Sequence, residues 1–243
     1  FSIPPAGDIV LILISGCLML FGLASYYQAL TIAETTEVII LMKMIPLFTL
    51  ILSLIFLGQT LNLSQLIGFL LILVGTLLIS LQKNTTNFKV SKTFYLMALS
   101  SFLFASAYVI FAYVSREVTF QQSVAFESWG VFLGSMILAA FSSGTRQGFL
   151  MSLKSLNYQR LSIIFLNEGM FVIAKYFTFL AVSLGPVALV SVLEGMQLFY
   201  GLILGIVLTL LIPKVFQESV GRSAFFRKVA ISSLIFLGIY LSV

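Results

Sequence analysis

The sequence contains no histidine, a single cysteine and few charges: only 9% of its 243 residues are Asp, Glu, Lys or Arg, against 60% hydrophobic ones. Without histidine the chain holds no Ser–His triad, no HExxH zinc helix and no His-ligated haem, and Cys17 alone forms neither an internal disulfide nor a cysteine cluster. The GxxxxGK[ST] and GxGxxG motifs, which bind nucleotide phosphates, are also absent. Hydrolytic, redox and ATP-driven chemistry are therefore disfavoured, and we expect neither an enzyme nor a cofactor.

The low charge content also predicts where the chain folds. A soluble domain carries about 25% charged residues, so this chain cannot cover itself with a polar surface and we expect it in a membrane. About 20 helical residues cross a hydrocarbon core of about 30 Å, and the apolar runs predict eight helices. These cover residues 9–30, 36–57, 63–81, 93–114, 124–141, 160–183, 186–212 and 228–243. The expected fold is an all-α, polytopic membrane helix bundle.

The basic residues in the loops predict the orientation of the bundle. When the loops are assigned alternately to two sides, one side holds ten Lys and Arg residues and the other holds Arg116 alone. Short cytoplasmic loops retain positive charge, so we expect residues 82–92, 142–160 and 213–227 on the cytoplasmic side of the cell membrane. Residues 147–161 mix apolar and basic side chains and are expected along the inner membrane surface. The net charge of +5 thus indicates orientation, and no nucleic-acid partner is expected.

Two parts of the chain resemble each other. The stretch SYYQALTIAETTEVII aligns with KYFTFLAVSLGPVALV, which pairs Tyr26 with Tyr176. Further along, SQLIGFLLILVGTLLIS aligns with RKVAISSLIFLGIYLSV, which pairs Gly75 with Gly238. By the assignment of the loops the two copies cross the membrane in opposite directions. Inverted repeats are typical of secondary transporters, whose substrate sites lie near the midplane between the repeats.

The residues of the first copy carry a family resemblance. From Tyr26 to Ser80, including KMIPLFTLILSLIFLGQTLNLSQLIGFLLILVGTLLIS, the chain resembles the last three helices of an EamA-type repeat in the drug/metabolite transporter superfamily. Residues 93–243 resemble a complete five-helix second repeat, with SLGPVALVSVLEGMQ at the start of its fourth helix. The resemblance implies an incomplete first repeat at 1–82 and a second repeat at 83–243. It also implies that the first two of the family's usual ten helices are absent from this segment.

The sequence departs from the family at three points. The family usually has both termini in the cytoplasm, whereas the distribution of charge puts the C-terminus of this segment outside, and we follow the charge. Gln59 stands where the family's GE[RK] motif has an acidic residue, and Gly195 stands where a proline often follows the Glu of the ninth helix. The resemblance therefore assigns no role to these two positions.

Four charged residues lie deep in the predicted helices: Lys43, Glu168, Lys175 and Glu194. An ionised side chain at the bilayer centre costs about 2.5–3.5 kcal/mol, so these residues must be paired, neutralised or in contact with water. The rise per residue places Lys43 and Glu168 at one level nearer the cytoplasm. It places Lys175 and Glu194 at one level nearer the outside, and Glu168 and Lys175 on one face of their helix.

These four residues predict a central polar cavity in which they bind a charged or zwitterionic solute, or carry a coupling proton on Glu168 or Glu194. The alternative is a set of structural salt bridges that fixes helix positions. Amides and tyrosines suited to hydrogen bonding a solute or contacting an amine could line the same cavity, although each is also readable as ordinary packing. These candidates are Asn167, Gln197, Gln28, Tyr26, Tyr176 and Tyr200.

Two further features have mainly structural interpretations. Glu127 and Trp129 fall within a turn of the outer end of the predicted helix 124–141, where Trp is expected in an interfacial belt; a gating role is the alternative. Gly130 and Gly134 have the GxxxG spacing that is typical of close helix packing in membranes.

The sequence as a whole predicts a secondary transporter of EamA type that moves a small polar or amphipathic metabolite across the cell membrane by alternating access. Export is the direction that the resemblance implies. The alternatives are a flippase for a lipid-linked substrate, and a membrane scaffold subunit without transport, in which the four charges would be fully paired and no cavity would exist. The expected partners are a small-molecule solute, membrane lipids and a coupling proton, and the protein is expected as a monomer or homodimer.

Overall fold

The computed structural model describes residues 4–33, 41–80, 92–154 and 156–194, together with the single positions 38, 234, 237, 238 and 241. Across these residues the secondary structure is entirely helical, with eight α-helices and one short 3-10 helix. The elements are α1 (Ala6–Ile32), η1 (Met42–Met44), α3 (Ile45–Leu57), α4 (Leu63–Ser80), α5 (Lys92–Val114), α6 (Phe120–Phe141), α7 (Ser143–Lys154), α8 (Tyr158–Leu184) and α9 (Val187–Leu193). The predicted all-α fold is confirmed.

Four of the described helices are long and apolar enough to cross a membrane: α1, α5, α6 and α8. α3 is a shorter apolar helix. The protein is therefore a polytopic membrane helix bundle. The predicted helix 228–243 and the part of 186–212 after residue 194 lie outside the described residues, apart from isolated positions.

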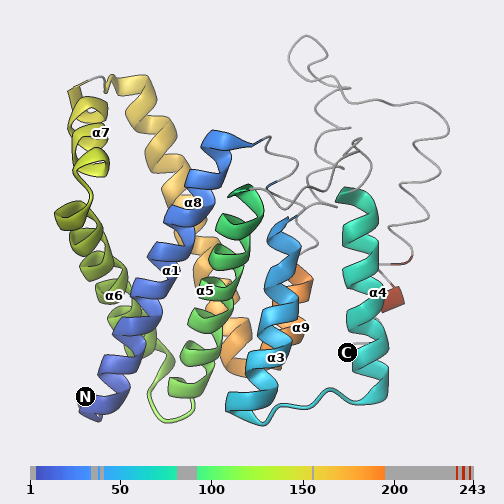
Figure 1. Cartoon of the computed structure of the whole chain (residues 1–243). Helices are drawn as coiled ribbons and strands as arrows, with labels where there is room; N and C mark the ends of the chain where they lie inside the picture. Colours follow the sequence, from blue (N-terminus) through green and yellow to red (C-terminus); the bar gives the residue numbers. More distant parts are fainter. Residues whose placement is uncertain are drawn as a thin grey trace.

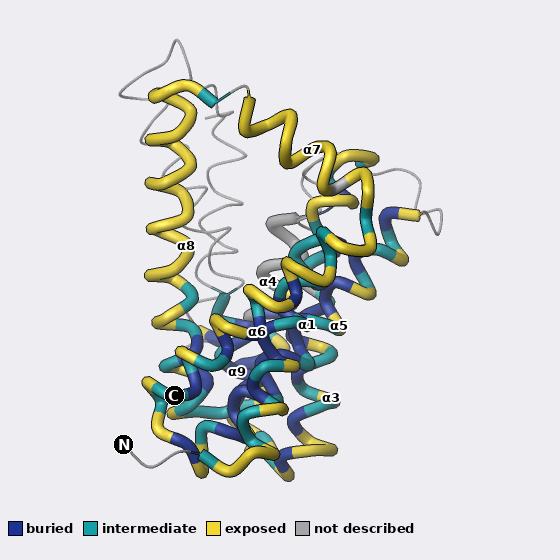
Figure 2. Tube along the Cα trace, turned by 90° about the vertical axis from the view of Figure 1, so that its left-hand side faces the viewer, coloured by how far each residue is buried: buried dark blue, intermediate teal, exposed yellow. Residues whose placement is uncertain are grey.

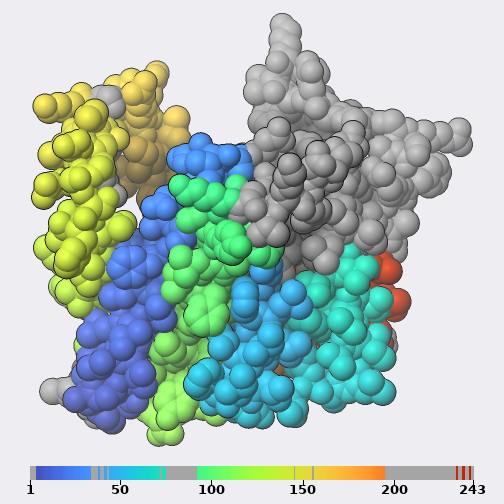
Figure 3. Space-filling view, viewed as in Figure 1, coloured from blue at the N-terminus to red at the C-terminus, as the bar shows by residue number. Residues whose placement is uncertain are grey.

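Successive long helices run in alternate directions (Figure 1). The turns at residues 58–62 and 115–119 lie at one end of the bundle with the N-terminus, and the α7–α8 connection lies at the other. We call the first of these the Arg116 end. Seen from one face, α1, α5, α3 and α4 lie side by side (Figure 3). α1 packs against both α5 and α6, and α3 packs against α5 and α9.

Local sequence signals explain where the helices begin and end. Asn62 and Gln65 form a reciprocal cap at the start of α4: the Gln65 N–H donates to Asn62 Oδ1 at 2.8 Å, and the Asn62 N–H donates to Gln65 Oε1 at 3.1 Å. Asn157 accepts the N–H of Arg160 at the start of α8. α3 ends at Gly58, whose φ of 61° is left-handed and suits glycine.

Two predicted segments have different boundaries in the structure. The predicted continuous helix 36–57 is interrupted by the 3-10 turn η1, because Pro46 lacks an N–H and its ring disfavours an α-helical turn before it. The surface segment predicted at 147–161 is divided between α7, which ends at Lys154, and α8, which begins at Tyr158.

Small residues hold α1 against its neighbours. A side chain at Gly16 or Gly130 would bring its Cβ into the backbone of the facing helix, at Glu127 O and Leu13 O respectively. Cys17 Sγ donates to Gly130 O at 3.2 Å across the same contact. Without a hydrophobic driving force between helices in lipid, close backbone approach supplies the packing energy, so the helix-packing interpretation of the GxxxG pair is confirmed.

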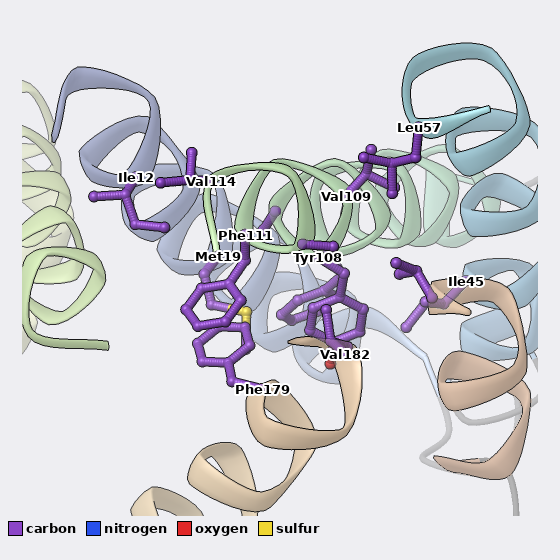
Figure 4. Close-up of a cluster of buried hydrophobic side chains, with 14 of the residues drawn as sticks. Ile12, Met19, Ile45, Leu57, Tyr108, Val109, Phe111, Val114, Phe179 and Val182 are labelled. Atoms are coloured by element: carbon purple, nitrogen blue, oxygen red, sulfur yellow. The ribbon is translucent and has the colours of Figure 1, made fainter. Parts of the chain in front are cut away.

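Buried hydroxyls join α1 to α5 in the same region. Ser15 Oγ donates to Ala107 O at 2.9 Å, and Ser100 Oγ donates to Gly22 O at 2.8 Å. An apolar cluster extends from this contact to α8, and its centre is the stacked pair Phe111 and Phe179, with ring centroids 4.0 Å apart (Figure 4). The cluster connects the tightly packed α1–α5–α6 unit to the helices that carry most of the deep charges.

Candidate functional site

Four helices bring polar groups to one level near the Arg116 end of the bundle. Glu127 lies seven residues after the first residue of α6, Tyr108 six residues before the end of α5, and Lys175 nine residues before the end of α8. Glu194 follows α9, a short helix that rises from the same end. At 1.5 Å per residue, each of these groups is about 9–14 Å from that end, well inside the hydrocarbon core.

The central contact is an ion pair between α8 and α6. Lys175 Nζ lies 2.6 Å from Glu127 Oε2, and the side chains are 15% and 0% exposed. The sequence predicted Glu127 at the membrane interface, and this prediction is wrong because α6 begins at Phe120 and not at 124. Thr119 Oγ1 donates to Gln122 Oε1 at 2.9 Å beside this helix start. The T-x-x-Q spacing is the sequence signal that would have placed Glu127 two turns inside the helix.

Aromatic rings continue the site from the ion pair toward α5. Lys175 Nζ lies 5.4 Å from the centroid of the Phe179 ring, within the range of a cation–π contact. Phe179 stacks on Phe111 and makes an edge contact with Tyr108 at 6.1 Å. All three rings are almost fully buried, so the ammonium group is bordered by a dry aromatic wall.

Hydroxyl groups hold Glu194 at the Tyr108 end of this wall. Tyr108 Oη donates to both carboxylate oxygens of Glu194, at 3.1 and 3.2 Å, and Thr178 Oγ1 donates to Oε1 at 3.0 Å. Lys175 and Thr178 are three residues apart on α8 and so are neighbours on its surface. We call this set the Lys175 network: Tyr108, Glu127, Lys175, Thr178, Phe179 and Glu194.

One side of the ion pair retains unsatisfied polar atoms. Glu127 Oε1 and Ser123 Oγ are buried without a hydrogen-bond partner among the described residues. Both side chains are 0% exposed, and four residues separate them on one face of α6. Glu127 Oε2 likewise has no hydrogen bond by strict geometry, but its 2.6 Å contact with Lys175 satisfies it as an ion pair.

The other predicted site residues lie apart from the Lys175 network in the described contacts. Asn167 and Glu168 are exposed, as is every residue of α8 from Tyr158 to Ala174 (Figure 2). Gln28 is exposed on α1, and Tyr26 is half-buried in a small apolar cluster with Ala29.

Three more predicted residues fall at or beyond the limits of the description. Lys43 lies in the η1 turn, but its side chain is outside the described residues, as are Gln197 and Tyr200. Tyr176 is 43% exposed and packs edge-on against Phe120 at the outer part of the α6–α8 contact. The predicted pairing of Lys43 with Glu168 therefore stays a prediction.

An open cavity of about 250 Å³ lies at the Arg116 end. Its lining consists of Gln59, Ala112, Arg116, Val182, Ser183, Leu184, Gly185 and Pro186. Ala112 is one turn from Tyr108, and Val182 is one turn from Thr178, so the cavity lining lies about one helical turn along α5 and α8 from the Lys175 network. The sequence predicted a cavity at mid-depth, whereas this one opens at the end of the bundle.

Gln59 connects two parts of the chain beside this cavity. Its Oε1 accepts the N–H of Val187 at 3.1 Å, which satisfies a backbone donor in the first turn of α9. An amide can accept this bond without bringing a charge to the helix start. The structure thus supplies a role for a position at which the resemblance assigned none.

Comparison with known proteins agrees with the helical architecture. Eleven chains of solved structures match, and one of them, a crystal structure of a protein with no stated function, has a TM-score of 0.68 and 18% sequence identity. The match covers 95% of the present chain and 74% of the other, and at this identity it shows the fold alone. No curated protein matches the sequence. Residues 1–81 match the EamA-like transporter family, so this part of the chain is EamA-like and the resemblance to the drug/metabolite transporter superfamily is confirmed there.

Proposed function

We propose that the protein is a secondary transporter that moves a small polar or amphipathic metabolite across the cell membrane by alternating access. The family match supports membrane transport in general. The observation that carries the finer proposal is the Lys175 network, which places one ammonium group, two carboxylates and two hydroxyls inside the bundle, about one helical turn from the lining of an open cavity.

The cost of the network argues for a functional role. Each ionised group in the membrane core costs about 2.5–3.5 kcal/mol on insertion scales, and buried ion pairs can often be replaced by apolar residues without loss of stability. The glycine and serine contacts of α1 show that this chain can pack its helices without buried charges. Charged groups at this depth are therefore best explained by a charged or zwitterionic solute that they bind.

The location of the network supports alternating access. Its members come from α5, α6 and α8 and from the residue that follows α9, so a relative movement of these helices opens or closes it. The cavity at the Arg116 end supports entry or release of solute there, and by the charge of the loops this end faces outward. The direction of transport in the proposal is export, as for the resembling family.

A non-transporting scaffold is the main competing function, and it is favoured by the direct pairing of Lys175 with Glu127. A flippase for a lipid-linked substrate would use a lateral opening between helices. The exposed half of α8 is where such an opening would be sought, since Glu168 and Asn167 are exposed there.

Transport by the purified protein in liposomes tests the proposal. Labelled amines, amino acids and small carboxylates are offered separately, and accumulation is compared with protein-free liposomes. We expect at least one class to accumulate, and the Lys175→Met and Glu194→Gln variants to lose that activity while eluting as single species in detergent. The matched control is Lys154→Met, because Lys154 is exposed at the end of α7. Equal transport by wild type and Lys175→Met would remove the network from the mechanism, and the absence of transport of every class would refute the function.

A further inference from the structure

We infer that Lys175 switches between Glu127 and Glu194, so that a proton on Glu127 and an ammonium-bearing solute at Glu194 exclude each other. The inference rests on the proposed transport function and deepens it by naming the solute class and the exchanged ion. It arises from a lysine that pairs with Glu127 and is linked to Glu194, an acid at the same depth, by a chain of side-chain contacts. The sequence associated a coupling proton with Glu168 or Glu194, whereas the structure assigns it to Glu127.

Glu127 has the surroundings of a proton-binding group. Its carboxylate is fully buried, Lys175 neutralises it through one oxygen, and the other oxygen has no partner among the described residues. The buried hydroxyl of Ser123, also unpartnered there, lies one turn nearer the Arg116 end. A metal ion does not suit this place, because the Lys175 ammonium already lies 2.6 Å from Oε2. A proton adds to the carboxylate without displacing any ligand.

Of the titratable groups on the described helices packed around Glu127, Lys175 is the one that determines whether its carboxylate is ionised. On α1, the Cys17 thiol donates to a backbone carbonyl of α6. On α5, Tyr108 is hydrogen-bonded to Glu194, and on α8 Tyr176 packs against an aromatic ring of α6. Among the described contacts, Lys175 is the basic group that meets Glu127.

Side-chain contacts of α8 and α5 lead from the same lysine to Glu194. Thr178, its neighbour on α8, already donates to Glu194 Oε1 at 3.0 Å. The Lys175 ammonium lies over Phe179, whose ring contacts Tyr108, the second donor to Glu194. The ring face therefore provides a favourable surface along which a cation on a flexible four-carbon chain passes from one acid to the other.

Protonation of Glu127 moves Lys175 to Glu194 and releases the solute. A hydronium ion from the Arg116 end gives its proton to the Glu127 carboxylate, forming one O–H bond, and departs as water. Lys175 keeps its own protons, loses its counter-ion and pairs with Glu194. A solute ammonium held by Glu194 is then displaced by the Lys175 ammonium. When Glu127 ionises again, Lys175 returns to it and Glu194 binds the next solute, which couples proton entry to solute exit.

Substitution of the acids and the lysine, singly and together, tests this switch. Tyramine and putrescine serve as probes: binding is measured per folded molecule in detergent, and proton movement is followed in liposomes with an internal pH dye. Glu127→Gln imitates the protonated acid and is expected to weaken probe binding on the order of tenfold or more. Glu127→Gln/Lys175→Met removes the displaced lysine and is expected to restore binding. Lys175→Met alone is expected to bind the probes without moving protons.

Several results would overturn the inference. Equal probe binding by all variants would reduce the ion pair to a structural contact, because a structural role changes the folded fraction but not binding per folded molecule. Transport of carboxylates or neutral solutes with no movement of amines would refute the switch and leave the transport function intact. Movement of no solute of any class would instead refute the transport function itself. Glu117→Gln, on the exposed α5–α6 turn, is the matched acid control and should behave as wild type.

Discussion

The α1–α5–α6 contact and the Lys175 network solve the problem of helix association in lipid in different ways. Around α1, glycines let backbones touch, and each serine hydroxyl that crosses the contact meets a carbonyl. Around Lys175, long charged side chains make the contacts between helices, and at least two buried oxygens lack partners among the described residues. The first arrangement leaves little to rearrange. The second consists of charged side chains with unsatisfied oxygens beside them, which agrees with the proposed solute site.

The largest effect is expected from filling the glycine contact. Gly130→Leu places a side chain against the backbone carbonyl of Leu13, which cannot move without separating α1 from α6. We expect the cost to exceed the about 1–3 kcal/mol that is usual for overpacking by enough to prevent folding, seen as loss of the monodisperse species in detergent. Gly169→Leu is the matched control, because a Cβ at Gly169 meets nothing within 4 Å. A stable Gly130→Leu protein would show that the contact is adaptable.

A smaller effect is expected from breaking the ion pair. Lys175→Met leaves Glu127 buried without its counter-ion, which costs about 3–5 kcal/mol for buried pairs in general. In Lys175→Met/Glu127→Gln no charge is stranded, so most of the stability should return. Thermal unfolding in detergent measures both variants. If the double variant is no more stable than the single one, the pair contributes packing and not charge compensation.

A still smaller effect is expected from removing the Tyr108 hydroxyl, which binds Glu194. Tyr108→Phe keeps the ring contacts and removes the donor, and hydrogen bonds to charged groups contribute about 1.5–3 kcal/mol. The affinity for solute should fall by more than the stability of the fold, because the apolar cluster around the ring is unchanged. Tyr95→Phe on the exposed side of α5 is the control. Equal binding by both variants would separate Tyr108 from the site.

The smallest effect is expected at the α9 cap. Gln59→Ala removes the acceptor of the Val187 N–H, and loss of a helix cap costs about 0.5–2 kcal/mol. The midpoint of thermal unfolding should fall slightly. The Lys175 network should keep its geometry, and the protein should keep its solute affinity. Gln121→Ala, at an exposed position in the first turn of α6, serves as the control. A large loss of solute affinity in Gln59→Ala would extend the functional region to the cavity.

The fold was largely predictable from the sequence because lipid solvent imposes long apolar runs. The helix boundaries were less predictable, because they were placed from the apolar runs alone. The sequence does contain the local signals: Pro46 is a helix breaker, and Thr119 with Gln122 has the spacing of a helix start. Residue counting placed Lys175 and Glu194 at a common depth. In the structure Lys175 contacts Phe179 and Glu194 binds Tyr108, and these two rings contact each other.

The partners of those charges were not predictable. Depth along a helix axis follows from the rise per residue, but rotation about the axis and the choice of neighbouring helix follow from packing. Glu127 therefore paired with Lys175 although its position had suggested an interface. Glu168 lies two helical turns from Lys175, yet it is exposed because the half of α8 that carries it leaves the packed part of the bundle.

The hydrogen bonds between α3 and α9 define a mechanical unit that differs from the sequence repeats. Gln59 binds the start of α9 just after the end of α3, and Thr49 Oγ1 lies 2.5 Å from Ser191 Oγ further along the same two helices. α3 belongs to the predicted first repeat and α9 to the predicted second. With two ties along their length, they are fixed against both sliding and splaying. In the proposed alternating access, a movement of α9 that exposes Glu194 would carry α3 along with it, so the moving body would combine parts of both predicted repeats.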